Sequence, residues 1–448
     1  MTRQRAPQGD LVTSAVGRLF RIGSVATKVG MSLATQQATS FFFSDPIAQA
    51  RKTEKFMLNA MRVTEALGEL KGAAMKVGQM LSVHEGLLPP EVNSVLRSLQ
   101  NEAPRVPFER MDAVLRAEVP FDDLFAELEP EAIAAASIGQ VYRGKLKDGR
   151  AVAVKIQYPD IDQVVRSDLK NLKKLFGGIV GMVAEVDFDE VWEELKDRLL
   201  EELDYELEAA NMARMADLHR DIPEVLVPRV IPEASSRRVL TMEYLPGIAP
   251  ADACSERYSQ EARDRWGRVL LEFTIRGLLE QRFLHADPNF GNYAFLDDGR
   301  LIVYDHGCMK VIPEALAGNY GRVLGALIAQ DLEVLPQILY DMGIYKRKTG
   351  KPVSRSILDP MAREAMTIVG SEPFRFSDET EIYDLIFDAK AEYLTELTDV
   401  GLPPDLVFVN RTLSGLFGNL CRLQAEGSWA EVLAPYVERA IQTADLDC

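Results

Sequence analysis

Three side chains in the second half of the sequence have the types and the spacing that the transfer of a phosphoryl group requires. Asp287 lies five residues before Asn292, and Asp305 follows after a short apolar stretch. One carboxylate beside an attacking hydroxyl, with an asparagine and a second carboxylate that hold Mg²⁺ against phosphate oxygens, can carry out that chemistry. The pattern therefore predicts a magnesium-dependent nucleotide site around these three residues.

A predicted β-hairpin separates Asn292 from Asp305. Tyr293–Leu296 and Leu301–Tyr304 are β-like runs, and Asp297-Asp298-Gly299 between them is a strong turn signal. Kinases use the same order of parts: HxDxxxxN, a hairpin and then DxG. The alternative, in which these residues only shape a hairpin, leaves the joint spacing unexplained.

A lysine closes an apolar strand earlier in the chain, in Val152-Ala153-Val154-Lys155. This signal is weak by itself, because strand ends often carry a surface lysine. A buried lysine needs a carboxylate to stay charged, and the acidic helix predicted around residues 201–208 offers several. Leucines recur every fourth residue from 199 to 207, so Asp204 and Glu208 are expected on one side of this helix, next to the apolar stripe. The sequence does not choose among these acids.

Residues 239–247 read as a strand that runs into a linker. In a kinase, backbone groups of this linker hydrogen-bond the adenine edge, which makes Glu243 and Tyr244 candidates. A plain edge strand is the other interpretation.

The elements that must position these groups fall into four predicted parts. We expect a leader at 1–45, a helical extension at 46–130, a strand-containing lobe at 131–247 and a helical lobe at 248–448. Within the third part, Asp148-Gly149 between two β-like runs predicts a hairpin. The predicted fold class is α+β, with a small β-containing N-terminal lobe and a helical C-terminal lobe.

Composition narrows the choice of function. The 448 residues are 47% hydrophobic and 27% charged, enough to bury a large core. The formal net charge of −17 argues against nucleic-acid binding. Only four histidines and four scattered cysteines occur, which disfavours a multi-histidine metal site and a disulfide scaffold but leaves oxygen-ligated magnesium open.

The predicted location is cytoplasmic, since no apolar stretch approaches the roughly 20 residues of a membrane-spanning helix and no signal peptide is evident. Residues 11–44 contain three basic and no acidic residues among apolar ones. They could lie on an anionic membrane as an amphipathic helix. A partly ordered leader that packs on the rest of the chain is the alternative.

Three further motifs give the chain a likeness to a known family. Lys76-Val77-Gly78-Gln79 looks like a KxGQ signature, Glu202-Leu203-Asp204 looks like an ExD signature, and the segment from Ala134 to Val141 looks like an alanine-rich nucleotide loop. With the kinase parts, these motifs resemble the ABC1/UbiB/ADCK atypical kinases, the COQ8-like and AarF group. The likeness covers roughly residues 71–310.

This resemblance implies roles for individual residues. Lys155 would contact the phosphates of ATP and pair with Glu208, Asp287 would occupy the catalytic-loop position, and Asn292 and Asp305 would hold Mg²⁺. The residues expected to surround the nucleotide are Ala134, Ala135, Ala136, Ser137, Gly139, Gln140, Val141, Lys155, Glu243 and Tyr244.

The resemblance also implies a regulatory cap. Lys76, Gly78 and Gln79 would fold over the site near Glu202 and Asp204, where a protein substrate would otherwise enter. In addition, only 308–312 separates Asp305-His306-Gly307 from the next helical run, too short for a protein-kinase activation segment. We therefore expect ATP hydrolysis or phosphorylation of a small-molecule or lipid substrate. The resemblance further implies a role in support of quinone (ubiquinone-type) biosynthesis or lipid homeostasis.

Two departures from the family pattern leave the shape of the loop in question. Asn289-Phe290 replace a His-Pro pair, and His306 stands where DFG has phenylalanine. Two other functions stay open: a pseudokinase scaffold that binds nucleotide without turnover, and a phosphotransferase resembling aminoglycoside or choline kinases.

Overall fold

The computed structural model describes residues 106–136, 138–163, 165, 166, 169, 173, 188–370, 372–377, 400, 401 and 403–446. The chain forms two compact units, one from Met1–Pro104 with Asp162–Lys196, the other from Arg105–Ile161 with Asp197–Cys448. The predicted leader and the KxGQ motif of the helical extension lie outside the described residues.

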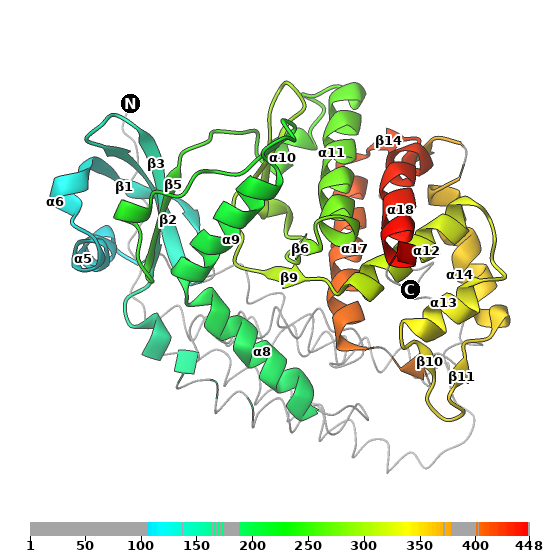
Figure 1. Ribbon diagram of the computed structural model, residues 1–448. Helices are drawn as coiled ribbons and strands as arrows, with labels where there is room; N and C mark the ends of the chain where they lie inside the picture. The colour runs from blue at the N-terminus through cyan, green and yellow to red at the C-terminus, as the bar shows by residue number, and fades with distance from the viewer. Residues whose placement is uncertain are drawn as a thin grey trace, which may run out of the picture. The chain divides into compact units, whose positions relative to one another are not determined.

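An antiparallel sheet forms the first part of the second unit (Figure 1). After α5 (Phe108–Glu118) and α6 (Phe121–Leu124) come β1 (Phe125–Ala135), β2 (Gly139–Leu146) and β3 (Ala151–Gln157), and β5 (Val239–Glu243) completes the order β1-β2-β3-β5. The predicted hairpin between β2 and β3 is confirmed. Gly149 in its turn has φ +93°, a conformation that favours glycine.

The strand β1 was not expected at its observed length. It begins at Phe125, inside the range predicted as helical extension, and it pairs with β2 through several register shifts. Apart from Phe125 its side chains are exposed or half-buried, so the strand carries no alternation of buried and exposed residues that the sequence could show. The predicted division into four domains stays a prediction.

The helix predicted through residues 201–208 is wrong, because two helices meet there. The first, α8 (Phe188–Glu202), ends before Leu203, and α9 (Tyr205–Leu218) starts after Asp204. Asp204 has non-helical angles, φ −120° and ψ 92°, and its carboxylate accepts hydrogen bonds from the backbone N–H groups of Glu206 and Leu207, as an N-cap does. Leu207 is 40% exposed, so the leucine repeat does not mark one buried stripe.

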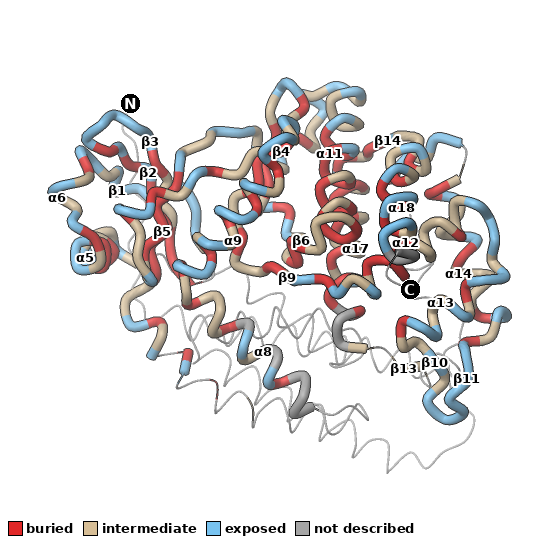
Figure 2. The backbone as a smooth tube through the Cα atoms, viewed as in Figure 1, coloured by how far each residue is buried: buried red, intermediate tan, exposed pale blue. Residues whose placement is uncertain are grey.

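The second part of this unit is mainly helical. Its central helix, α11, buries most of its residues (Figure 2), and α17 and α18 pack against it. The helices are α10 (Pro250–Ala253), α11 (Gln260–Leu279), α12 (Glu314–Ile328), α13 (Leu335–Asp341), α14 (Arg355–Ile368), α17 (Pro404–Leu423) and α18 (Trp429–Leu446).

Short strands connect these helices. The second predicted hairpin is confirmed as β7 (Tyr293–Phe295) and β8 (Leu301–Val303), with Gly299 at φ +96° in its turn. The other short elements are β4 (Val225–Leu226) beside β8, β6 (Phe283–His285) paired with β9 (Met309–Val311), the one-turn helices η1 (Pro232–Ala234) and η2 (Phe290–Asn292), β10 (Tyr345–Lys346) between β11 (Lys351–Pro352) and β13 (Val400–Gly401), and β12 (Phe374–Arg375) with β14 (Glu426–Gly427).

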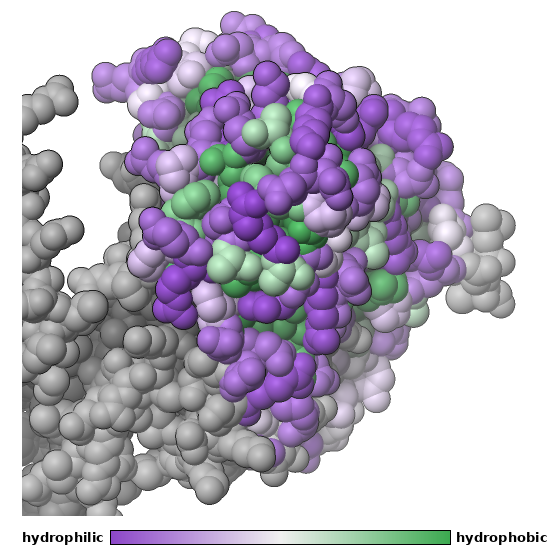
Figure 3. Space-filling view, turned by 90° about the vertical axis from the view of Figure 1, so that its left-hand side faces the viewer, coloured by the Kyte–Doolittle hydropathy of each residue, from purple (hydrophilic) through white to green (hydrophobic). Residues whose placement is uncertain are grey.

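Hydrophilic side chains cover most of the face that carries α5 and α6, and the apolar ones gather only in small patches (Figure 3). Scattered apolar residues are normal on a folded surface. Within the described ranges, no helix has both the length and the apolar composition needed to cross a bilayer.

Candidate active site

An ion cluster forms around Lys155 on β3. Its Nζ lies 2.8 and 2.9 Å from the two carboxylate oxygens of Glu208 on α9, and 3.0 Å from Oδ2 of Asp305. The side chains of Lys155 and Glu208 are 10% and 4% exposed, whereas that of Asp305 is 36% exposed. Three residues that are up to 150 positions apart thus meet, and only Asp305 of the three retains substantial access to solvent.

The electrostatics of this cluster favour a charged lysine. Burial alone would lower the pKa of Lys155, but the carboxylates of Asp305 and Glu208 raise it well above its ordinary value. Burial raises the pKa of Glu208 to about 7, and the adjoining Lys155 opposes that shift. We favour an ionised Glu208, because both of its oxygens lie within hydrogen-bond distance of the ammonium group.

Tyr205, the first residue of α9, contributes to the cluster although no motif pointed to it. Nζ of Lys155 lies 5.0 Å from the centroid of its ring, a cation–π contact. The ring is 1% exposed, and its hydroxyl has no hydrogen-bond partner among the described residues. Burial raises the pKa of this hydroxyl, so the phenol stays neutral beside the carboxylates. Tyr205 thereby confines the lysine side chain.

The second group of side chains lies in the loop that follows β6, the predicted catalytic loop. Nδ2 of Asn292 donates to Oδ2 of Asp287 over 3.0 Å, which holds these two predicted site residues together. Asn289 and Phe290, which replace the His-Pro pair of the family pattern, both make contacts within this loop and the hairpin that follows it. Oδ1 of Asn289 accepts from the backbone N–H of Gly291 over 3.1 Å, and the buried ring of Phe290 packs edge-on against Phe295.

Hydrogen bonds from β6 and from α9 hold the backbone around Asp305 in place. Nε2 of His285 lies 2.5 Å from its carbonyl oxygen, and the backbone N–H of Gly307 donates to its Oδ1 over 3.0 Å. Nδ2 of Asn211 on α9 donates to the carbonyl oxygen of His306 over 3.1 Å. These contacts hold the Asp-His-Gly segment between α9 and β6.

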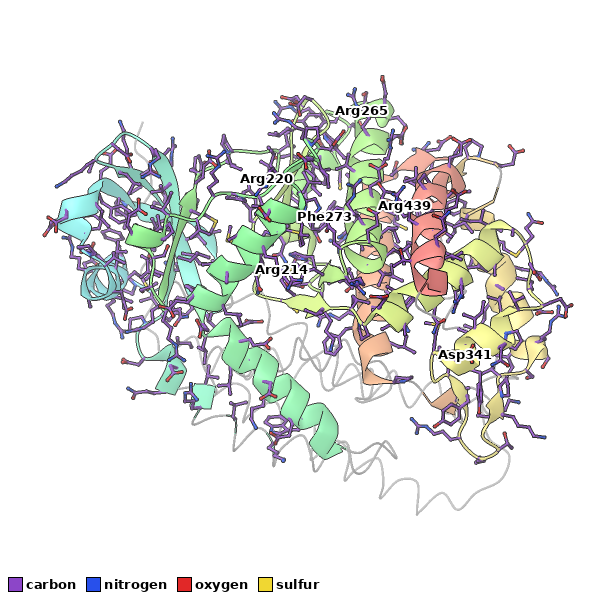
Figure 4. The ribbon with its side chains drawn as sticks, in the orientation of Figure 1. Arg214, Arg220, Arg265, Phe273, Asp341 and Arg439 are labelled. Carbon is purple, nitrogen blue, oxygen red and sulfur yellow. The ribbon has the colours of Figure 1, made fainter. Side chains whose placement is uncertain are left out.

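His306 behaves as a packing residue. Its ring is fully buried, 5.6 Å from the ring of His285, which in turn lies 6.0 Å from Phe273 on α11 (labelled in Figure 4). Burial lowers the pKa of His306 to about 3, which keeps the ring neutral near pH 7. A neutral imidazole thus stands where the family pattern has an apolar ring.

The alanine-rich segment forms the turn between β1 and β2. Ala134 pairs with Val141 and Ala135 with Gln140, and the backbone N–H of Ala136 donates to the carbonyl of Gly139 over 2.9 Å. Oε1 of Gln140 accepts from the backbone N–H of residue 106, and its Nε2 donates to the hydroxyl of Tyr142, so both ends of this side-chain amide already have partners in the protein. Ser137 lies outside the described residues.

Of the two linker candidates, Glu243 is the last residue of β5 and Tyr244 follows it. The backbone N–H groups of Glu243 and Tyr244 donate to the carbonyl oxygens of Arg229 and Ala151. Because these N–H groups already have partners, hydrogen bonds between these two residues and the adenine edge would have to be accepted by their carbonyl oxygens.

The predicted cap residues are only partly described. Glu202 ends α8 and Asp204 caps α9, one turn before Glu208. Lys76, Gly78 and Gln79 lie outside the described residues.

The residues around Asp305 fit a magnesium ion. Within the described part of the chain, no group of three or more histidine, cysteine, aspartate and glutamate side chains is placed to hold a metal by itself. Mg²⁺ needs fewer protein ligands, since it is usually held by one or two carboxylates together with water and phosphate. Asn292 uses its amide nitrogen on Asp287, which leaves its amide oxygen for a cation. The carboxylates of Glu208 and Asp305 carry two negative charges against the one positive charge of Lys155, and the remaining negative charge favours a bound cation.

One side chain from outside every predicted motif also reaches the site. A guanidinium nitrogen of Arg411 on α17 lies 3.7 Å from Oδ1 of Asp287. More than 120 positions separate the two residues in the sequence, and no local spacing could have linked them.

Comparisons with known proteins agree with the geometry. A family model described as the ABC1 atypical kinase-like domain matches residues 98–339. The chain is similar to the atypical kinase COQ8B, mitochondrial, of Rattus norvegicus, with 32% identity over 434 residues that cover 94% of this chain and 80% of that protein. It is also similar to the atypical kinase COQ8, mitochondrial, of Saccharomyces cerevisiae, with 27% identity over 92% of this chain and 83% of that protein.

A solved structure supports the fold. It is the complex of Rv3197 from Mycobacterium tuberculosis with erythromycin, which matches with a TM-score of 0.63 and 30% identity over 87% of this chain and 97% of that one. The predicted kinase-like α+β fold class is confirmed.

Proposed function

Because this chain belongs to the ABC1 atypical kinase-like family, we propose that it binds ATP with Mg²⁺ and transfers the γ-phosphoryl group to water or to a small molecule. Proteins are not the proposed acceptors. The proposed biological role is support of quinone (ubiquinone-type) biosynthesis or of lipid homeostasis.

The observation that carries the proposal is the convergence of Lys155, Glu208 and Asp305. The lysine bridges an acid of α9 and an acid of the segment after β8, at distances of 2.8 to 3.0 Å. In kinases, the corresponding lysine and glutamate pair and the corresponding aspartate binds the metal. A buried charge cluster of this kind is costly to maintain for folding alone, which favours a functional reason for it.

Each residue then has a proposed part. Lys155, fixed by Glu208 and Tyr205, binds phosphate oxygens of ATP. Asp305 and the amide oxygen of Asn292 hold Mg²⁺, which neutralises charge on the phosphates when it is bound. Asp287 orients the attacking hydroxyl or water. The backbone of the turn at 134–141 and the carbonyls of Glu243 and Tyr244 are proposed to surround the nucleotide.

The short path after Asp305 supports an acceptor smaller than a protein. The backbone N–H of Ala286 donates to the carbonyl of Cys308 over 2.9 Å, β9 pairs with β6 as far as Val311, and α12 begins at Glu314. No long segment for docking a peptide lies between Asp305 and α12. We also propose that Lys76, Gly78 and Gln79 cap the site near Glu202 and Asp204, and that the chain is cytoplasmic with peripheral membrane contact through residues 11–44.

The decisive test is ATP turnover by Asp305→Asn. The variant keeps the shape of the side chain but loses the charge that binds the metal, so magnesium-dependent ATP hydrolysis should fall by about a hundredfold or more. Asp298→Asn, in the exposed turn of the same hairpin, is the matched control and should leave turnover unchanged.

Other outcomes would point elsewhere. Full turnover in Asp305→Asn would contradict the proposed mechanism. Nucleotide binding without turnover in the unaltered protein would indicate the pseudokinase scaffold. ATP-dependent phosphorylation in a screen of small alcohols would indicate an aminoglycoside- or choline-kinase-like phosphotransferase.

A further inference from the structure

Helix α17 presents three residues to the catalytic loop at intervals of four. Arg411, Gly415 and Asn419 share one face of this helix, since residues four apart lie one above another. This helix begins at Pro404, well after residue 339, where the match to the family domain ends. All three contact the segment Asp287-Pro288.

Gly415 and Asn419 fix the backbone of the loop. A Cβ atom at position 415 would lie 2.3 Å from Cβ and from Cγ of Pro288, so only glycine lets the helix approach this closely. Nδ2 of Asn419 donates to the carbonyl oxygen of Pro288 over 2.9 Å. Asn419 is 4% exposed, and a buried amide that lost this bond would be left without water to replace it.

Arg411 acts on the carboxylate of Asp287. This carboxylate is held on one side by Asn292, through Oδ2, and faces the guanidinium group of Arg411 on the other, through Oδ1. The side chains of Arg411 and Asp287 are 23% and 21% exposed, so the contact is partly shielded from water. A carboxylate with a donor on one oxygen and a positive charge near the other has little freedom to rotate.

We propose that α17 is a positioning element of the active site, in which Gly415 and Asn419 set the path of the loop and Arg411 sets the orientation of the Asp287 carboxylate. The inference rests on the proposed function, because it assigns a role in turnover. Asp287 is proposed to orient the acceptor and not to bind the nucleotide. Loss of this support should therefore lower kcat and leave KM for ATP unchanged.

Two glycines of α17 provide a matched test. Gly415→Ala and Gly418→Ala add the same methyl group to the same helix, but no atom of the described residues lies within 4 Å of a Cβ at position 418. We expect Gly415→Ala to lower kcat by about tenfold or more, since small misplacements of catalytic groups have effects of this size, and Gly418→Ala to match the unaltered protein. Equal kcat values for the two variants would overturn the proposal.

The arginine is tested with graded substitutions. Arg411→Gln should lower kcat by about tenfold with KM for ATP changed by less than about twofold, and Arg411→Lys should recover part of the loss because it restores the charge. Arg422→Gln, at an exposed position in the last turn of α17, is the control. An increase in KM for ATP as large as the loss in kcat would show that Arg411 acts on the nucleotide instead.

Hydrogen exchange of the backbone amides of residues 286, 287 and 289–292 tests the positioning role of α17 independently of the proposed function, since Pro288 has no N–H to exchange. Gly415→Ala should exchange faster than Gly418→Ala at these amides whether or not the protein hydrolyses ATP. If the unaltered protein binds ATP without turnover, the proposed function fails and the exchange rates still decide whether α17 holds the loop. If turnover is present and neither kcat nor exchange responds, the positioning role alone is wrong. Thermal unfolding of each variant checks that it is folded.

Discussion

The two sides of the candidate site are held by different forces. On the lysine side, Lys155, Glu208 and Asp305 are bound to one another by charge, and two of the three are almost fully buried. On the loop side, Asp287 and Asn292 are held by a neutral amide donor, by the guanidinium group of Arg411 and by the packing of α17 against Pro288. A buried ion cluster fixes the first group, and helix packing with one partly exposed arginine fixes the second.

This difference matters because the two kinds of support fail differently. Removing one member of a buried ion cluster leaves an uncompensated charge, which destabilises the whole fold. Disturbing a packed helix displaces the loop but leaves few charges unpaired. Variants on the lysine side should therefore change stability and activity together, and variants on the loop side should mainly change activity.

The largest effect on stability is expected for Lys155→Met. The carboxylate of Glu208 would lose its cation, and the free energy of unfolding should fall by about 3 kcal/mol at pH 8. Burial already raises the pKa of Glu208 to about 7, and loss of the lysine would raise it further. An acid whose pKa is higher in the folded than in the unfolded state stabilises the fold when protonated. Between about pH 7 and the higher pKa of Glu208 in the variant, only the folded variant carries the proton, so the deficit should shrink as the pH falls through this range and stay constant below it. Urea unfolding at pH 5 and pH 8 measures the change.

A double variant controls this prediction. Lys155→Met with Glu208→Gln replaces the charged acid by a neutral amide, so it should recover part of the lost stability at pH 8. An equal deficit for Lys155→Met at both pH values would contradict the view that charge holds this side of the site.

A smaller effect is expected at Asp204, which caps α9 and so supports Glu208 indirectly. Asp204→Ala should lower the free energy of unfolding by about 1 kcal/mol, because two backbone N–H groups lose their acceptor. Asp204→Asn should keep most of the stability, since asparagine also caps helices. If Asp204→Asn nevertheless changes ATP turnover, the charge has the regulatory role that we propose for the ExD motif, in addition to its role as a cap.

The smallest effect is expected at the turn between β1 and β2. Ala135→Gly removes a methyl group and frees the backbone to approach phosphates more closely, so the affinity for ATP should rise by roughly two- to fivefold. Ala126→Gly, on the same strand but far from the turn, is the control. A titration that finds unchanged or weaker ATP binding in Ala135→Gly would contradict a restraining role of the alanine-rich loop.

Local patterns in the sequence predicted much of this structure. Both hairpins follow from an Asp-Gly pair between β-like runs, and the glycines of both turns have positive φ angles. The resemblance to the family further implied the pairing of Lys155 with Glu208, which the structure contains. The pairing joins residues 53 positions apart and could not be chosen from the spacing alone, because several acids were equally available.

Three features lay beyond such reasoning, each for a physical reason. The break at Asp204 was missed because the leucine spacing continues across it, although the second helix turns Leu207 towards solvent. The length of β1 was missed because its exposed residues show no alternation. The contacts of α17 with the loop depend on how distant helices pack, and the glycine that permits them has no chemistry of its own for a motif to contain.

The pairing of β9 with β6 has one more consequence. Many signalling enzymes are turned on when a modification orders a long flexible stretch next to the metal-binding aspartate. Here that stretch is the three residues 306–308 before β9, and the carbonyl oxygen of Cys308 already accepts from the backbone N–H of Ala286. We therefore expect regulation of this protein to act on what enters or covers the site and not on the stretch beside Asp305, whose backbone is already paired.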